Sequence, residues 1–210
     1  MNNYNLTSNR TRKLAKYALF CLVLVMSLGN SLRAQVNTNS GSGLAASYPD
    51  LAAAITALNG ATISGPITMT LTTAETAPAG GYVITAQGDA VNTIVIDGAT
   101  NVVTANGTQT IGALNDGIFK LVGADYITIQ NFVMQENAAN STTAAATNNM
   151  TEWGVALLYA TTTNGAQNNT IQNNTISLNR TYQNTFGIYS NSTHSSTAIT
   201  AATATTAAGG

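Results

Sequence analysis

Hydrophobic and polar residues follow a helical period in the N-terminal third of the chain. Apolar side chains recur at helical spacing within residues 49–59, at Leu51, Ala54, Ile55 and Leu58. Pro49 suits a first helical turn, Asp50 favours the positive end of the helix, and Gly60 suits its termination. This segment therefore predicts a short amphipathic helix.

After this helix, hydrophobic residues recur at every second position. Ile67, Met69 and Leu71 alternate with threonines, and one residue separates Ile94 from Ile96. Each run is short and is bounded by Gly, Asn, Asp or Pro, which is typical of β-strands. The chain therefore continues as a series of short strands.

Two series of repeated segments interleave in the second half of the chain. The segment IQNFVMQEN begins at Ile129 and IQNNTISLN begins at Ile171, 42 residues later. The segments GIFKL, GVALL and GIYS begin at Gly117, Gly154 and Gly187, which are 37 and 33 residues apart. A fixed order of strands with loops of unequal length indicates a repeating coil, and stacked coils bury a continuous core.

Stacking predicts which side chains face the core. Alternation places five isoleucines inward: Ile127, Ile129, Ile171, Ile176 and Ile188. Thr128 and Gln172 are predicted to face outward. Asn131 and Asn173 occupy matching turn positions, so we expect a hydrogen-bonded side-chain ladder between them; the alternative is that Asn is simply frequent here.

A family resemblance extends this prediction. The segments TIVIDG, ADYITIQNF and NNTIQNNTISLNR, followed by GIYS, resemble right-handed parallel β-helix proteins of the pectin-lyase-like fold. With YPDLAAAITALN they resemble large repeat proteins of Gram-negative bacteria that use type IX secretion. The resemblance covers residues 47–193 and implies an all-β fold, a right-handed parallel β-helix (solenoid) with a short N-terminal capping α-helix. It also implies downstream coils of the same polypeptide and a C-terminal sorting domain, neither of which this sequence contains.

The N-terminus has the order of a secretory signal peptide. Basic residues between positions 10 and 16 precede an apolar run at 19–28, and GNSLRAQ follows. Residues 1–34 are predicted to be removed by cleavage after Ala34, which leaves the mature chain without a transmembrane segment and without Cys21, the only cysteine. Residues 35–46 are predicted to be a flexible lead-in, and residues 194–210 a low-complexity Ala/Thr/Gly tail or truncated loop.

Charge excludes one class of partner. Only 7% of residues are charged. From Gln35 onward Lys120 and Arg180 are the only basic residues, against eight acids, so the mature chain has a net charge of −6. A chain without a basic stripe is not expected to bind nucleic acid.

The sequence assigns no catalytic, cofactor-binding or metal-binding residue and implies no cofactor. A β-helix lyase needs clustered carboxylates for calcium and a basic residue, whereas Asp97, Asp125, Glu136 and Glu152 lie in different turns. Glu136 and Arg180 are expected to approach each other near one edge, and we interpret that pair as a surface contact rather than a catalytic one.

A few aromatic side chains and one histidine are further candidates for ligand binding. Four aromatic residues offer faces for stacking on sugars: Trp153, Tyr159, Tyr182 and Tyr189. Trp153 and Tyr189 lie beside or within the glycine strands, which favours packing. His194, the only histidine, lies in a Ser/Thr-rich segment and cannot form a usual zinc site alone.

Export, repetition, low charge and the lack of a catalytic cluster predict a non-enzymatic structural or adhesive module, secreted or on the outer cell surface. Its expected partners are surface glycans or other cell-surface components, together with downstream coils. The alternative is a polysaccharide-binding or polysaccharide-cleaving, lyase-like β-helix, which is favoured by the fold resemblance alone.

Overall fold

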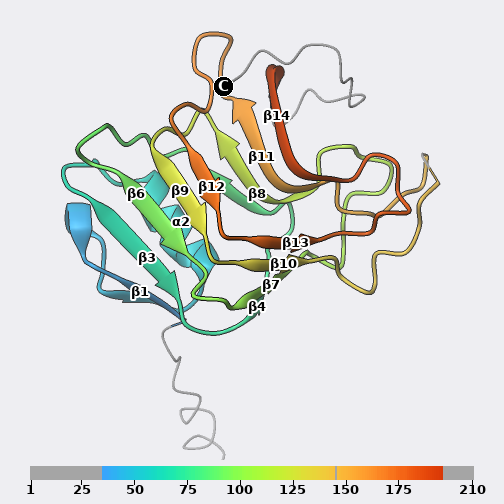
Figure 1. Ribbon diagram of the computed structural model, residues 1–210, viewed down its shortest axis with the longest axis horizontal. Helices are drawn as coiled ribbons and strands as arrows, with labels where there is room; N and C mark the ends of the chain where they lie inside the picture. Colours follow the sequence, from blue (N-terminus) through green and yellow to red (C-terminus); the bar gives the residue numbers. More distant parts are fainter. Residues whose placement is uncertain (1–34, 145, 196–210) are drawn as a thin grey trace, which may run out of the picture. The chain divides into compact units, whose positions relative to one another are not determined.

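The computed structural model describes residues 35–144 and 146–195 (Figure 1), and for residues 191–195 the description is limited to the backbone. The predicted signal peptide, its cleavage site after Ala34 and residues 196–210 of the predicted tail lie outside the described residues. His194 lies in a strand, but its side chain is not described.

Parallel strands from successive coils form three sheets (Figure 1). The first contains β3 (Ile67–Leu71), β6 (Ile94–Asp97), β9 (Ile127–Gln130) and β12 (Thr170–Gln172). The second contains β4 (Glu75–Thr76), β7 (Val102–Thr104), β10 (Val133–Gln135) and β13 (Thr175–Ser177). The third contains β5 (Tyr82–Ile84), β8 (Gly117–Val122), β11 (Trp153–Tyr159) and β14 (Phe186–Ser195). Each coil adds one strand to each sheet, so the predicted parallel β-solenoid is confirmed.

Aliphatic side chains stack in inward rows because the strands pair in register. Ile96 pairs with both Met69 and Ile129, and Ile129 pairs with Ile171. Ile127 and Ile129 are fully buried, as predicted. Such rows give the solenoid one continuous apolar core.

The inward isoleucines of the last described coil are more exposed than those of the earlier coils. Ile171 and Ile176 are partly buried and pack against the core. Ile188 lies in the predicted inward row, but its side chain is 53% exposed. Ile188 continues the row of Val155, but β14 is the outermost strand of its sheet among the described residues.

A helix packs on the opposite end of the core, as predicted. Helix α2 (Leu51–Asn59) begins at Asp50, whose side chain accepts a 2.7 Å hydrogen bond from Ala53 N. Its apolar face joins the core. Asn59 donates 2.8 Å to the carbonyl of Val83 in β5, which ties the end of the helix to the third sheet.

Residues 35–46 differ from the flexible lead-in expected from their composition. Strand β1 (Val36–Thr38) pairs antiparallel with β3 and with β2 (Ser47–Tyr48), and the 3-10 turn η1 (Gly41–Gly43) follows β1. Val36 is fully buried opposite Leu71. Two buried apolar side chains, Val36 and Leu44, and pairing with the edge of β3 thus order a segment whose other residues are mostly small and polar.

The amide ladder lies one residue before the predicted one. Asn131 and Asn173 instead adopt left-handed backbone conformations, with φ of 58° and 54°, which Asn tolerates at sharp turns. The Asn131 side chain donates to Asp97. The contact between two side-chain amides of neighbouring coils is made by Gln172 Nε2, which donates a 2.8 Å hydrogen bond to Gln130 Oε1.

The glycine series is in register for two of its three members. Trp153 pairs with Phe186, so Gly154 lies beside Gly187, and a Cβ on Gly154 would come within 2.5 Å of the Gly187 carbonyl oxygen. Gly117 instead pairs with Trp153, one residue from the predicted alignment. The two strands therefore start in register, and their glycines, Gly117 and Gly154, are offset by one residue.

The inward row predicts unequal effects of one substitution at adjacent positions. Ile129→Asp should lower the free energy of unfolding by several kcal/mol, because it buries an unpaired charge. Thr128→Asp, on the outward face, should cost about 0.5 kcal/mol or less. Chemical denaturation of both variants tests this, and equal losses would contradict the described register.

Candidate functional site

Three successive loops meet at one corner of the solenoid. They join β7 to β8, β10 to β11, and β13 to β14, so each connects the second sheet to the third (Figure 1). Because the strands on both sides of this corner stack in register, residues at the ends of these loops come together from different coils.

This corner encloses a cluster of ionisable side chains. Asp116, Lys120 and Glu152 are only 3%, 6% and 1% exposed, and Tyr182 is also buried. The pairing of Gly117 with Trp153 places Asp116 beside Glu152. Charged residues are almost never this deeply buried unless they are paired or hydrogen-bonded.

Main-chain groups make most of the hydrogen bonds of this cluster. Asp116 N donates 2.9 Å to Glu152 Oε2, and Glu152 N donates 2.9 Å to the Asp116 carbonyl. Thr110 N donates 2.9 Å to Asp116 Oδ2. Phe186 N, at the start of β14, donates 2.7 Å to the Glu152 carbonyl. Glu152 thus connects loops of three coils.

Burial dominates the electrostatics of the cluster. It raises the pKa of Glu152 to about 8 and raises the pKa of Asp116, because a charged carboxylate is poorly solvated there. Burial lowers the pKa of Lys120, although attraction to Asp116 and Glu152 acts in the opposite direction. The pKa of Tyr182 is raised, again mainly by burial. At neutral pH Glu152 is therefore mostly uncharged.

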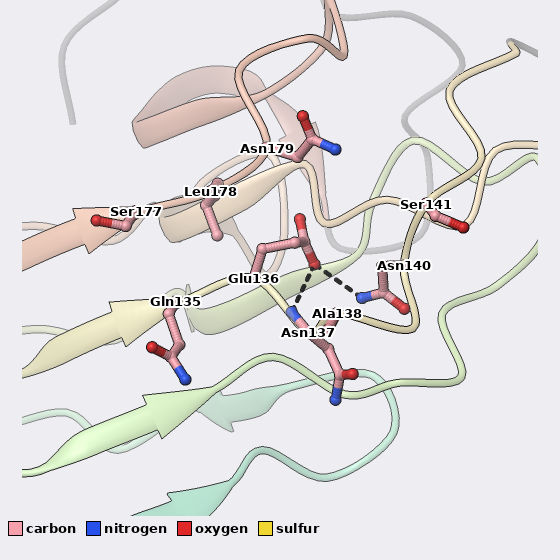
Figure 2. Close-up of a pocket in the computed structure, with 9 residues that line it drawn as sticks. All are labelled: Gln135, Glu136, Asn137, Ala138, Asn140, Ser141, Ser177, Leu178 and Asn179. Carbon is pink, nitrogen blue, oxygen red and sulfur yellow. Dashed lines mark hydrogen bonds between the residues drawn. The ribbon is translucent and has the colours of Figure 1, made fainter.

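A second polar network lies in the same group of loops and is centred on Glu136. Thr151 Oγ1 donates 2.7 Å to Glu136 Oε1 and accepts 2.9 Å from Gln109 Nε2. Figure 2 shows the Glu136 carboxylate bonded to the Asn140 amide, at 2.8 Å, and to the main chain of Asn137. The carboxylate therefore orders its own loop.

An open depression of about 560 Å³ lies beside this network (Figure 2). Its lining is mostly amides and hydroxyls, with one carboxylate and two apolar side chains: Gln135, Glu136, Asn137, Ala138, Asn140, Ser141, Ser177, Leu178 and Asn179. Such a surface offers hydrogen bonds to a polar ligand and carries little charge.

The expected approach of Glu136 to Arg180 is not observed. Arg180 is exposed, whereas the Glu136 carboxylate bonds to Thr151, Asn140 and Asn137. Asp97 and Asp125 bond elsewhere: Asp97 accepts from the Gln130 side chain and Asp125 from the main chain of Gln167, each in the next coil. In residues 35–144 and 146–195 no group of His, Cys, Asp and Glu is arranged to hold a metal ion.

The packing predicted for Trp153 and Tyr189 is observed. Both are buried, and their rings stack with centroids 5.1 Å apart and planes 13° apart. They form a second apolar cluster with Val122, Ala156 and Leu158.

Sequence reasoning missed the meeting of Asp116, Lys120 and Glu152. A signal was present, because Asp116 and Glu152 each lie immediately before one of the repeated strands. Aligning the segments on their glycines, however, shifts Asp116 by one position relative to Glu152. The true register, with Gly117 opposite Trp153, brings the two acids together.

Comparison with known proteins gives no relative from which to assign this site: no family, no curated protein and no solved structure matches the chain. Within the described part of the chain, no helix has both the length and the apolar character needed to cross a membrane.

The Glu136 network predicts a stability cost at Thr151. Thr151→Val keeps the shape of the buried side chain but removes the hydroxyl that joins Gln109 to Glu136. We expect a loss of about 1–3 kcal/mol in the free energy of unfolding, because buried polar groups lose a partner. The exposed Thr162→Val is the matched control and should change it by about 0.5 kcal/mol or less. A loss no larger than that of the control, measured by urea denaturation, would show that the network does not stabilise the corner.

Proposed function

We propose that the chain is a non-catalytic structural or adhesive module of an exported bacterial protein, secreted or held at the outer cell surface. The signal-peptide pattern of residues 1–34 supports export. The stacked coils support a structural role, because a solenoid presents extended, regular faces along its length.

One observation supports the proposal that the module is not an enzyme. The ionisable groups that come together, Asp116, Lys120 and Glu152, are enclosed, and their polar atoms are bonded largely to the main chain of neighbouring loops. General acid–base catalysis instead needs groups that reach a substrate. The cluster therefore serves to brace the coils.

The outward faces suit a neutral, hydrogen-bonding partner. On the first sheet one outward row consists of Thr68, Val95, Thr128 and Thr170. The next outward row contains one charged residue, Asp97, whose carboxylate accepts from the Gln130 side chain. We propose that such faces contact surface glycans or other cell-surface components.

We further propose that the chain is part of a longer repeat protein with the right-handed, pectin-lyase-like architecture that its segments resemble. Ile188 supports this, because it continues the inward row of Val155 and is half exposed. Gln172 adds support: its amide nitrogen donates to Gln130, so its oxygen is oriented to accept from a further coil.

Polysaccharide binding is the second candidate function. The amide-rich depression beside Glu136 favours it, since amides and hydroxyls match sugar hydroxyls and Leu178 offers an apolar contact. The geometry gives no equal support to cleavage, because the carboxylate in this depression is bonded to its own loop.

An activity assay separates module from enzyme. The full-length protein, incubated with pectate, pectin or alginate and calcium, should release products at the background rate. Turnover that disappears in Glu136→Gln or Arg180→Ala would instead make the chain an enzyme.

Export is tested on the producing cell. Protease treatment of intact cells, or analysis of the medium, should find the chain outside, and mass spectrometry should place Gln35 at its N-terminus. A chain that remains inside the cell with residues 1–33 attached would overturn the proposed location.

A further inference from the structure

We propose that the cluster of Glu152, Asp116, Lys120 and Tyr182 is a pH-sensitive latch, which holds the β13–β14 loop on the solenoid at neutral pH and releases it in mildly alkaline solution. This inference does not depend on the proposed function, because it concerns how one corner of the fold is held together.

Glu152 is the residue through which the three loops are joined. Its main chain accepts from Phe186 N at the start of β14 and donates to the Asp116 carbonyl before β8. Its side chain accepts from Asp116 N, and the Tyr182 hydroxyl of the β13–β14 loop faces its carboxyl group. A change in the charge of Glu152 therefore acts on both neighbouring coils.

The balance of charge around Glu152 depends on its proton. Asp116 faces it from the β7–β8 loop, Lys120 from β8 and Tyr182 from the β13–β14 loop. With Glu152 protonated, one carboxylate faces one ammonium group. With Glu152 ionised, two buried carboxylates face a single cation, and burying an uncompensated charge is costly.

Other charged groups nearby do not restore the balance. Glu136 bonds to Thr151, the residue before Glu152, and is a further acid. Arg180, on the same loop as Tyr182, is exposed. An extra negative charge at the corner is therefore relieved most easily if the β13–β14 loop separates.

The sign of the pH dependence follows from the direction of the pKa shift. The pKa of Glu152 is raised by burial to about 8, so its contribution to stability is complete below the unfolded pKa, near 4.5, and is lost as the pH rises through 8. The raised pKa values of Asp116 and Tyr182 act in the same direction. The lowered pKa of Lys120 acts in the opposite direction, since that contribution is lost as the pH falls from the unfolded lysine pKa. The window for release is therefore set by Glu152.

The fluorescence of a single tryptophan can report release of the loop. Trp153, the only tryptophan, follows Glu152 directly, is 1% exposed, and stacks on Tyr189 of β14. We would titrate the full-length protein between pH 6 and 9.5 and follow tryptophan emission. We expect a reversible shift to longer wavelength with a midpoint near pH 8, together with faster hydrogen exchange in residues 178–185 after correction for the intrinsic rate.

Three variants separate the latch from general alkaline loosening. Glu152→Gln resembles the protonated acid and should remove the transition. Asp116→Asn removes a facing negative charge, so Lys120 balances the ionised Glu152 and release should need a higher pH. Lys120→Met removes the cation, so release should begin at a lower pH. A tyrosine-ionisation artefact would persist in Glu152→Gln.

The proposal is overturned if the wild-type protein shows no transition in this range, or if the transition survives in Glu152→Gln. It is also overturned if Asp116→Asn and Lys120→Met move the midpoint in the same direction. Should Glu152→Gln fail to fold, the wild-type titration and the opposite shifts of the other two variants decide the question.

Discussion

The register between coils is the constraint on which the rest of the structure depends. Parallel strands about 4.8 Å apart align each residue with its counterpart in the next coil, and side chains alternate between the core and the surface. A slip of one residue would exchange the row of Met69, Ile96 and Ile129 with the outward threonines. The close approach of Gly154 to Gly187 adds a local condition, because a side chain there would collide with the neighbouring backbone.

The sequence predicts the repeating part of the fold well, because period and stacking act locally. The Ile-Gln-Asn repeat gives the alignment of Ile129 with Ile171, and the helical spacing gives α2. Contributions from distant segments were harder to predict. The order of β1 depends on the edge of β3, and the exposure of Ile188 depends on which strands surround β14.

The candidate site was unpredictable for a related reason. Asp116 and Glu152 each appear as an isolated acid beside a strand. They come together because β8 and β11 start in register, with a one-residue offset between Gly117 and Gly154. The amide ladder moved by one residue too, from Asn131 to Gln130, because the left-handed turn takes Asn131 out of the strand. Loop lengths between the second and third sheets differ from coil to coil, so spacing in the sequence does not reveal this offset.

Register can be measured directly by cross-linking, because Cys21 is the only cysteine of the chain. In a Cys21→Ser background, Thr128→Cys with Thr170→Cys places two cysteines on paired, outward positions. Their separation, about 4.8 Å, is within the disulfide range. We expect rapid disulfide formation in this pair and little in Thr128→Cys with Gln172→Cys, which is displaced by two residues along the strand. Preferential cross-linking of the displaced pair would contradict the stacking described for these coils.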